Sequence, residues 1–233
     1  MKLKLILIAF AFVSFTKPVT NDYKKDFGND YTHAVQWLKL NSNSFEQAAT
    51  RFDIPAQDLK AIVFPELIRY NTVYDAIEIN SLKYLYVSEG CAYADFSVGH
   101  FQMKPSFAEM VEQDANQYLD QNFLQACGFD KLKNIADNED SRNERITRIS
   151  SVEQQLIYLC TFYKICEARF AGQQFASANE KIRFYAACYN AGYRRSYEDV
   201  RTVQVKNYFH TGKFFTTVNY NYADISNYYL EKE

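Results

Sequence analysis

The chain has 233 residues, a length typical of one large domain. Hydrophobic residues make up 48% of it, and the low numbers of glycine (7) and proline (4) disfavour a turn-rich β-sandwich or barrel. The net charge of −2 gives no basic footprint for nucleic acid, although a local groove can differ in charge from the whole chain.

The first residues have the pattern of a secretory signal peptide. Lys2 and Lys4 form a basic start, and the apolar run Leu5–Phe15 that follows is too short to span a bilayer comfortably. We expect residues 1–20 to be removed on export to the periplasm or cell envelope, which would leave no stable membrane span. An uncleaved anchor is the alternative, because no clear cleavage pattern ends the run.

Hydrophobic periodicity and capping signals predict helices along most of the remaining chain. In order, the expected helices cover Thr32–Leu40, about 43–52, Pro55–Tyr70, Tyr74–Ser88, 105–119, about 150–170, 177–191 and Ala223–Lys232. Between them we expect a loop that can hold a short β-hairpin at 91–104, an exposed charged stretch at 138–148, and a strand pair or extended loop at 203–222. The sequence therefore predicts a mainly α fold in a single domain, residues 21–233.

Local signals refine these helices. Capping boxes are predicted at Ser106, Ser150 and Ser177, each followed by a glutamate three residues later. The helix after Ser150 is apolar nearly all round, which is typical of a central, buried helix. Pro65 lies inside its predicted helix and removes a backbone hydrogen bond, so we expect a bend or an interruption immediately before Glu66.

The cysteines and histidines do not indicate a metal site. The five cysteines are Cys91, Cys127, Cys160, Cys166 and Cys188, an odd number, so at least one is free or pairs between chains. The last three lie among apolar residues and are expected as small core residues. There is no Cys-x-x-Cys pair and the three histidines are scattered, so we expect neither a structural metal nor another cofactor.

Glu66 is the strongest candidate for a catalytic residue. At helical spacing it shares one face with Leu59, Ile62, Val63 and Tyr70. Burial on such a face would raise the pKa of the carboxyl, and a carboxylic acid that keeps its proton near neutral pH can act as a general acid. The alternative is a structural glutamate that pairs with an arginine or lysine from another helix.

Two later stretches reinforce this candidate. Residues 94–105 read ADFSVGHFQMKP and residues 187–192 read ACYNAG. Taken in order with FPEL at 64–67, they resemble the soluble lytic transglycosylase family of the lysozyme superfamily. That family has a catalytic glutamate at a helix end, then a G-L-M-Q-x-x-P-like turn, and later A-Y-N-A-G. The resemblance spans about 55–192, and we expect a domain core of about 43–195 with a C-terminal extension at 196–233.

The resemblance implies a lysozyme-like fold, as in goose-type lysozymes, and cleavage of peptidoglycan glycan strands. The bond is the β-1,4 linkage between N-acetylmuramic acid and N-acetylglucosamine. In the family, the glutamate protonates the leaving oxygen and then removes a proton from the sugar's own 6-hydroxyl, which closes a 1,6-anhydro ring. This route needs no second carboxylate, because the nucleophile is intramolecular and already positioned.

The resemblance also implies binding roles for five residues: Gly99, Gln102, Met103, Tyr189 and Asn190. Gly99 would let the backbone approach the sugar, and Gln102 would hydrogen-bond an acetamido group or the backbone. Tyr189 is expected to orient the catalytic glutamate, and Asn190 to contact the substrate or the turn.

Three features keep alternatives open. Leu67 stands where the family usually has serine, and the gap between Glu66 and Gly99 is longer than is typical. Asp95 lies just before the turn, and if its carboxyl is about 6.5–9.5 Å from that of Glu66, activation of water and hydrolysis with inversion become feasible. A muramidase and a wall-binding scaffold without turnover are therefore the alternatives to a lytic transglycosylase.

Overall fold

The computed structural model describes residues 22–70, 72–132, 137–210 and 218–233, with the side chains of 72–80 left undescribed. Within these ranges the chain forms α-helices, one short 3-10 helix and two isolated β-bridges, so the mainly α class is confirmed. The predicted signal peptide lies outside the described residues. None of the described helices is long and apolar enough to cross a membrane.

The helices match the predicted ones closely. They are α1 (Tyr23–Phe27), α2 (Asn29–Leu40), α3 (Ser42–Phe52), α4 (Ala56–Arg69), α5 (Thr72–Glu89), α6 (Pro105–Tyr118), α7 (Gln121–Cys127), η1 (Asp130–Leu132), α8 (Glu139–Ile149), α9 (Val152–Arg169), α10 (Ala178–Ala191), α11 (Tyr197–Gln204) and α12 (Tyr222–Lys232). Every helix expected from the sequence is present, with its ends displaced by about three residues or fewer. Periodicity did not reveal α1, α7, α8 and α11, which are short or carry many charged residues.

One sequence prediction between the helices needs correction. The stretch 138–148 is not simply exposed, because it belongs to α8 and buries Arg145 and Ile146.

The segment 203–222 was expected to be a strand pair or an extended loop. After the end of α11 at Gln204, its described residues form a loop with one antiparallel bridge, between Phe209 and Tyr220. Residues 211–217 lie outside the described residues.

The capping predictions had mixed outcomes. The hydroxyl of Ser177 caps α10 by accepting a hydrogen bond from the amide three residues later, as predicted. Ser151, rather than Ser150, caps α9. Ser106 is not a cap at all, because α6 already begins at Pro105.

The predicted interruption before Glu66 is wrong, since α4 continues through Pro65 to its end. Every residue from Leu59 to Ile68 is buried. The helix packs against α2, α3, α10 and α12. Tertiary packing around the whole helix therefore outweighs the backbone hydrogen bond that the proline removes.

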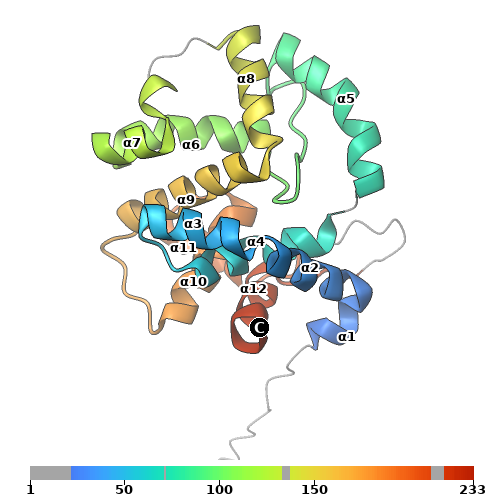
Figure 1. Ribbon diagram of the computed structural model, residues 1–233. Coiled ribbons are helices and arrows are strands. Elements are labelled where there is room, and N and C mark those ends of the chain that lie inside the picture. The colour runs from blue at the N-terminus through green and yellow to red at the C-terminus, as the bar shows by residue number, and fades with distance from the viewer. Residues whose placement is uncertain (1–21, 71, 133–136, 211–217) are drawn as a thin grey trace, which may run out of the picture.

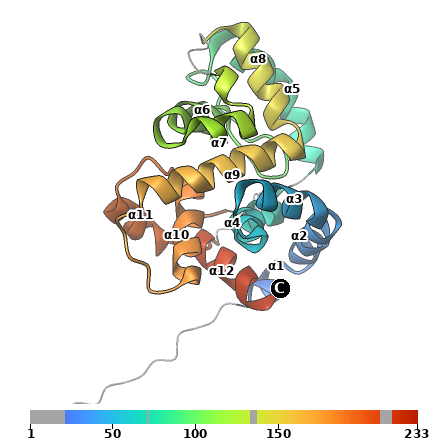
Figure 2. The same ribbon diagram turned by 60° about the vertical axis from the view of Figure 1, so that its left-hand side comes forward.

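The central position of α9 is confirmed. In two views it lies between α5–α8 on one side and the helices α1–α4 and α10–α12 on the other (Figures 1 and 2). It packs against α6 and α8 in the first group and against α3 and α4 in the second. Most of its apolar residues, including Cys160 and Cys166, are buried, and all five cysteines of the chain are free thiols.

The C-terminal segment joins the same core. Helix α12 packs against α4 and α10, and its residues Tyr222, Ile225 and Tyr229 are buried. The buried hydrophobic side chains form one continuous cluster from α1 to α12. The segment expected as an extension is therefore part of the wall that surrounds α4.

A buried ion cluster joins the helices of the α5–α8 group to α9. Arg145 of α8 binds Glu112 of α6 through two nitrogens, at 2.9 and 2.8 Å, and also donates to the Tyr86 hydroxyl at 2.7 Å. The other oxygen of Glu112 accepts from Arg148 at 2.9 Å and from the hydroxyl of Tyr158 on α9. Because each charge is paired and hydrogen-bonded, the cluster can remain buried.

Candidate active site

A pocket of about 260 Å³ lies where α4, α6 and α10 meet the loop before α6. Its lining residues are Glu66, Arg69, Ser97, Gln102, Met103, Lys104, Phe107, Tyr189 and Asn190. The three sequence motifs, which are far apart along the chain, therefore contribute to one cavity. Of the candidates, Glu66, Gln102, Met103, Tyr189 and Asn190 line it, whereas Gly99 and Asp95 do not.

Glu66 is 4% exposed although it lines the pocket. Burial raises the pKa of its carboxyl to about 7, and it outweighs the opposing effects of Arg69, Lys104 and the Tyr222 hydroxyl. At neutral pH the carboxyl is therefore close to half protonated. Such a group can donate a proton in one step and accept one in the next.

Arg69 is a member of the site that the sequence analysis missed. One of its guanidinium nitrogens lies 2.8 Å from Oε2 of Glu66, one turn earlier on α4, in an ion pair without hydrogen-bond geometry. The guanidinium also lies over the ring of Phe209, 5.5 Å from its centroid. The alternative for Glu66 was an ion pair with a basic residue from another helix, but its basic partner comes from α4 itself. The i, i+3 spacing of the two residues was the signal that could have revealed this pair.

Tyr222 of α12 lies close to the carboxyl, although it does not line the pocket. It is buried, its hydroxyl donates to the Ile62 carbonyl at 2.9 Å, and its ring makes an edge contact with Phe209. The hydroxyl also lies close enough to Glu66 to lower the pKa of that carboxyl. No local sequence signal links it to Glu66, because the two residues lie on helices at opposite ends of the chain.

The loop before α6 forms a tight turn. Val98 and Met103 pair as an isolated antiparallel bridge, with N–H to carbonyl distances of 2.9 and 3.1 Å, so the expected hairpin is reduced to one pair. Gln102 has a left-handed backbone, with φ of 50°. Its backbone N–H and its side-chain amide both donate to the Gly99 carbonyl, at 3.1 and 3.0 Å. These bonds hold Gln102 at the pocket wall.

Gly99 lies outside the pocket lining, and its surroundings give a structural reason for a glycine. A Cβ at this position would lie 2.3 Å from Nε2 of Gln155, and the backbone is left-handed, with φ of 67°. The close approach of a side chain of α9 is therefore sufficient to require glycine here.

Gln155, which the sequence analysis did not single out, anchors the turn to α9. It is 1% exposed. Its amide nitrogen donates to the carbonyls of Val98 and Ile149 at 2.7 and 2.8 Å, and its amide oxygen accepts from the N–H of Phe101 at 3.2 Å. One side chain thus hydrogen-bonds three backbone groups, which fixes the turn against the central helix.

Tyr189 supports the turn from the opposite side. Its hydroxyl donates to the Phe101 carbonyl at 2.8 Å. The resemblance implied that Tyr189 orients Glu66, but this hydrogen bond goes to the backbone of the turn instead. The ring makes edge contacts with Phe107 and Phe162. Tyr189 therefore positions the turn rather than the carboxyl.

Asn190 lines the pocket and carries an amide nitrogen that makes no hydrogen bond among the described residues. Its Nδ2 is buried without a hydrogen-bond partner among the described residues, and the nearby Tyr208 hydroxyl lacks hydrogen-bond geometry with it. A buried amide without a partner costs free energy unless a ligand or water satisfies it. This is the property expected of a residue that binds a polar substrate group.

Asp95 has a structural role at the start of α6. Its carboxylate accepts from the N–H and the hydroxyl of Ser106, at 3.1 and 2.9 Å, and lies 3.5 Å from the Lys104 ammonium. It takes the place of the capping box that was predicted at Ser106. The carboxylate is thus engaged with the helix start and lies outside the pocket lining.

Searches against protein-family models, curated proteins and solved structures found no match to this chain. Within the described residues, no group of three or more histidine, cysteine or acidic side chains is placed to hold a metal ion.

Proposed function

We propose that this protein is an exported peptidoglycan lytic transglycosylase with Glu66 as its general acid and base. The observation that carries the proposal is a buried carboxyl, with its pKa raised to about 7, in a pocket shared by Gln102, Tyr189 and Asn190. These residues belong to the motifs whose order resembles the soluble lytic transglycosylase family. The order of the motifs and their meeting in one pocket both support this assignment.

The first step is delivery of a proton from Glu66 to the glycosidic oxygen as positive charge develops on the sugar ring. The carboxylate that remains is stabilised by the Arg69 guanidinium, 2.8 Å from Oε2. In the second step the carboxylate removes the proton of the sugar's 6-hydroxyl, and that oxygen bonds to the anomeric carbon. The carboxyl regains its proton, no water is consumed, and the product ends in a 1,6-anhydro ring.

The lining of the pocket favours this route over hydrolysis with inversion. Inversion uses a second carboxylate to activate water. Glu66 is the one carboxylate among the lining residues, and Asp95 is engaged at the start of α6. An intramolecular nucleophile removes the need for a second base.

The remaining wall fits an N-acetylated sugar. The free Nδ2 donor of Asn190 suits the carbonyl of an acetamido group. Met103 and Phe107 add apolar surface that suits its methyl group or the face of a sugar ring. The proposed substrate is therefore the glycan strand of peptidoglycan, cut between N-acetylmuramic acid and N-acetylglucosamine.

The test is mass spectrometry of purified peptidoglycan after digestion, with wild type and Glu66→Gln compared. We expect anhydro-ended muropeptides from wild type and a rate at least about 100-fold lower from the variant, because general acid–base catalysis contributes about 10²–10⁴-fold. Glu198→Gln, an exposed change on α11 that removes the same charge, is the matched control and should keep full activity.

Two other outcomes would replace the proposal. Reducing ends from wild type alone would identify a muramidase, and Asp95 would be the next residue to change. No product from either protein, with binding to the cell wall intact, would identify a wall-binding scaffold.

A further inference from the structure

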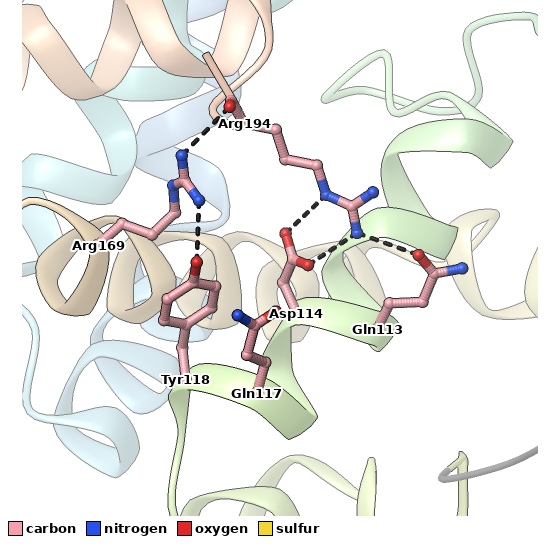
Figure 3. Close-up of a pocket in the computed structure, with 6 residues that line it drawn as sticks. All are labelled: Gln113, Asp114, Gln117, Tyr118, Arg169 and Arg194. Carbon is pink, nitrogen blue, oxygen red and sulfur yellow. Dashed lines mark hydrogen bonds and ion pairs between the residues drawn. The ribbon is translucent and has the colours of Figure 1, made fainter. Parts of the chain in front are cut away.

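A second pocket, of about 450 Å³, lies near the C-terminal end of α6 and shares no lining residue with the first. It is lined by Gln113, Asp114, Gln117, Tyr118, Arg169 and Arg194. Figure 3 shows the two arginines reaching toward α6 from the end of α9 and from the segment after α10. Every lining residue carries a polar group, so a polar ligand is the kind that the pocket suits.

Arg169 makes no ion pair with any carboxylate among the described residues. Its guanidinium donates to the Tyr118 hydroxyl at 2.9 Å and to the carbonyls of Arg194 and Arg195 at 3.2 and 3.4 Å. All three acceptors are neutral, and the buried Nε has no hydrogen-bond partner. A half-buried charge without a counter-ion is costly, and an anion in the pocket would offset that cost.

The neighbouring arginine does not compete for such an anion. Arg194 binds Asp114 through two nitrogens, at 2.8 and 2.7 Å, and donates to the Gln113 amide oxygen at 3.0 Å (Figure 3). This bidentate pair neutralises the one carboxylate in the lining. Two guanidinium groups and one carboxylate therefore leave the pocket with one excess positive charge.

The guanidinium of Arg169 is held in place before any ligand arrives. It lies 5.7 Å from the ring centroid of Tyr118 and 5.6 Å from that of Phe170. Stacking on two rings and three hydrogen bonds limit its rotamers. A planar, oriented donor group of this kind suits the oxygens of a carboxylate or a phosphate, and little side-chain entropy is lost on binding.

We propose that this pocket binds a small anion, a carboxylate or phosphate group, on the guanidinium of Arg169. The exposed amide of Gln117 supplies a neutral hydrogen-bonding neighbour. The inference rests on the contacts of Arg169 and is independent of the chemistry proposed for Glu66.

The experiment is an NMR titration of the full chain with sodium phosphate and, separately, with sodium acetate. Each series is compared with sodium chloride at the same ionic strength, because salt screening alone shifts exposed signals. We expect saturable shifts around Arg169, Gln117 and Tyr118 with at least one of the two anions. Tighter binding of phosphate would indicate a phosphorylated ligand, and tighter binding of acetate a carboxylate such as a peptide terminus.

Two variants test the assignment. Arg169→Gln removes the charge, and Gln117→Glu adds an opposing charge at an exposed side chain, so it is not expected to unfold the protein. Each should weaken binding about tenfold or more, the effect of losing one charge-assisted hydrogen bond. The matched controls are Arg201→Gln, whose guanidinium already pairs with Glu180, and Gln125→Glu on α7.

Three results would overturn the proposal. These are shifts that chloride reproduces, the absence of saturable shifts with both anions, or unchanged affinity in Gln117→Glu. Weakening confined to Arg169→Gln and Gln117→Glu, with both controls unaffected, would establish the site.

Discussion

At the scale of single residues, the site depends on the balance between burial and charge at Glu66. Burial raises the pKa of the carboxyl, and Arg69 lowers it through an ion pair on the same helix. Because burial is the larger effect, the pKa stays near 7 although a guanidinium lies 2.8 Å away. The residue can therefore hold a proton near neutral pH.

This balance predicts a pH dependence of stability. The folded pKa of about 7 exceeds the ordinary value of 4.5, so between these values the folded state binds more protons than the unfolded state. The free energy of unfolding should then fall as pH rises from 4.5 to 7. Relative to Glu66→Gln, wild type should lose roughly 3 kcal/mol between pH 4.5 and pH 8. Urea unfolding of both proteins at the two pH values measures this difference.

The comparison with Glu66→Gln cancels all other titrating groups. Glu198→Gln, made at an exposed position, should follow wild type at both pH values. Parallel behaviour of wild type and Glu66→Gln would mean that the carboxyl has an ordinary pKa in the folded protein.

At the scale of elements, the turn between Val98 and Met103 is the part that positions the pocket wall. It is held by Gln155 from α9 and by Tyr189 from α10. At Gly99 the side chain of Gln155 leaves no room for a Cβ. The geometry of the site thus depends on how α9 and α10 hold this short turn. No single sequence motif specifies that arrangement.

Replacing Gly99 tests how closely the turn packs against Gln155 of α9. Gly99→Ala places a Cβ 2.3 Å from Gln155 Nε2 in a left-handed backbone, and should lower the free energy of unfolding by about 3 kcal/mol, from backbone strain plus overpacking. Gly128→Ala has a similar φ of 77° but nothing within 4 Å, so it should cost only about 1 kcal/mol. Denaturant unfolding of the two variants compares these values, and equal losses would show that the contact with Gln155 is not restrictive.

At the scale of the whole molecule, α9 lies between two groups of helices (Figures 1 and 2), and the pocket is built from both of them. Glu66 and Tyr189 belong to the group with α4 and α10, and Phe107 belongs to the group with α6. The relative position of the groups therefore determines the shape of the site. The buried cluster around Glu112 and Arg145 is one of the contacts that hold α6 in its group.

Removing one partner from this cluster should strongly destabilise the folded protein. Arg145→Ala leaves a carboxylate oxygen of Glu112 and the hydroxyl of Tyr86 without their arginine, and should lower the free energy of unfolding by about 3–5 kcal/mol. Arg201→Ala is the control. It removes an ion pair that is more exposed than the cluster, and should lower the free energy of unfolding by at most about 1 kcal/mol. Denaturant unfolding measures both losses. If Arg145→Ala loses as little unfolding free energy as the control, the cluster does not have the stabilising role described.

Much of the fold could be predicted from the sequence because the signals are local. Apolar spacing and the Ser177 cap located helices to within a few residues, and the apolar circumference of α9 identified it as central. Predictions were wrong where a tertiary contact replaced the local one. Asp95 took over the cap expected at Ser106, and packing carried α4 through Pro65.

By itself the sequence determined the mainly α class, the helix that carries Glu66, and which segments lie close to it. Only the tertiary structure decided that burial outweighs the effect of Arg69 on that carboxyl, that Tyr222 lies close to it, and that Gln155 occupies the space beside Gly99. The physical reason is that helix formation depends on neighbours within a few residues, whereas desolvation and pairing of a charge depend on whatever packs around it. Those groups arrive from distant parts of the chain and are defined only once it has folded.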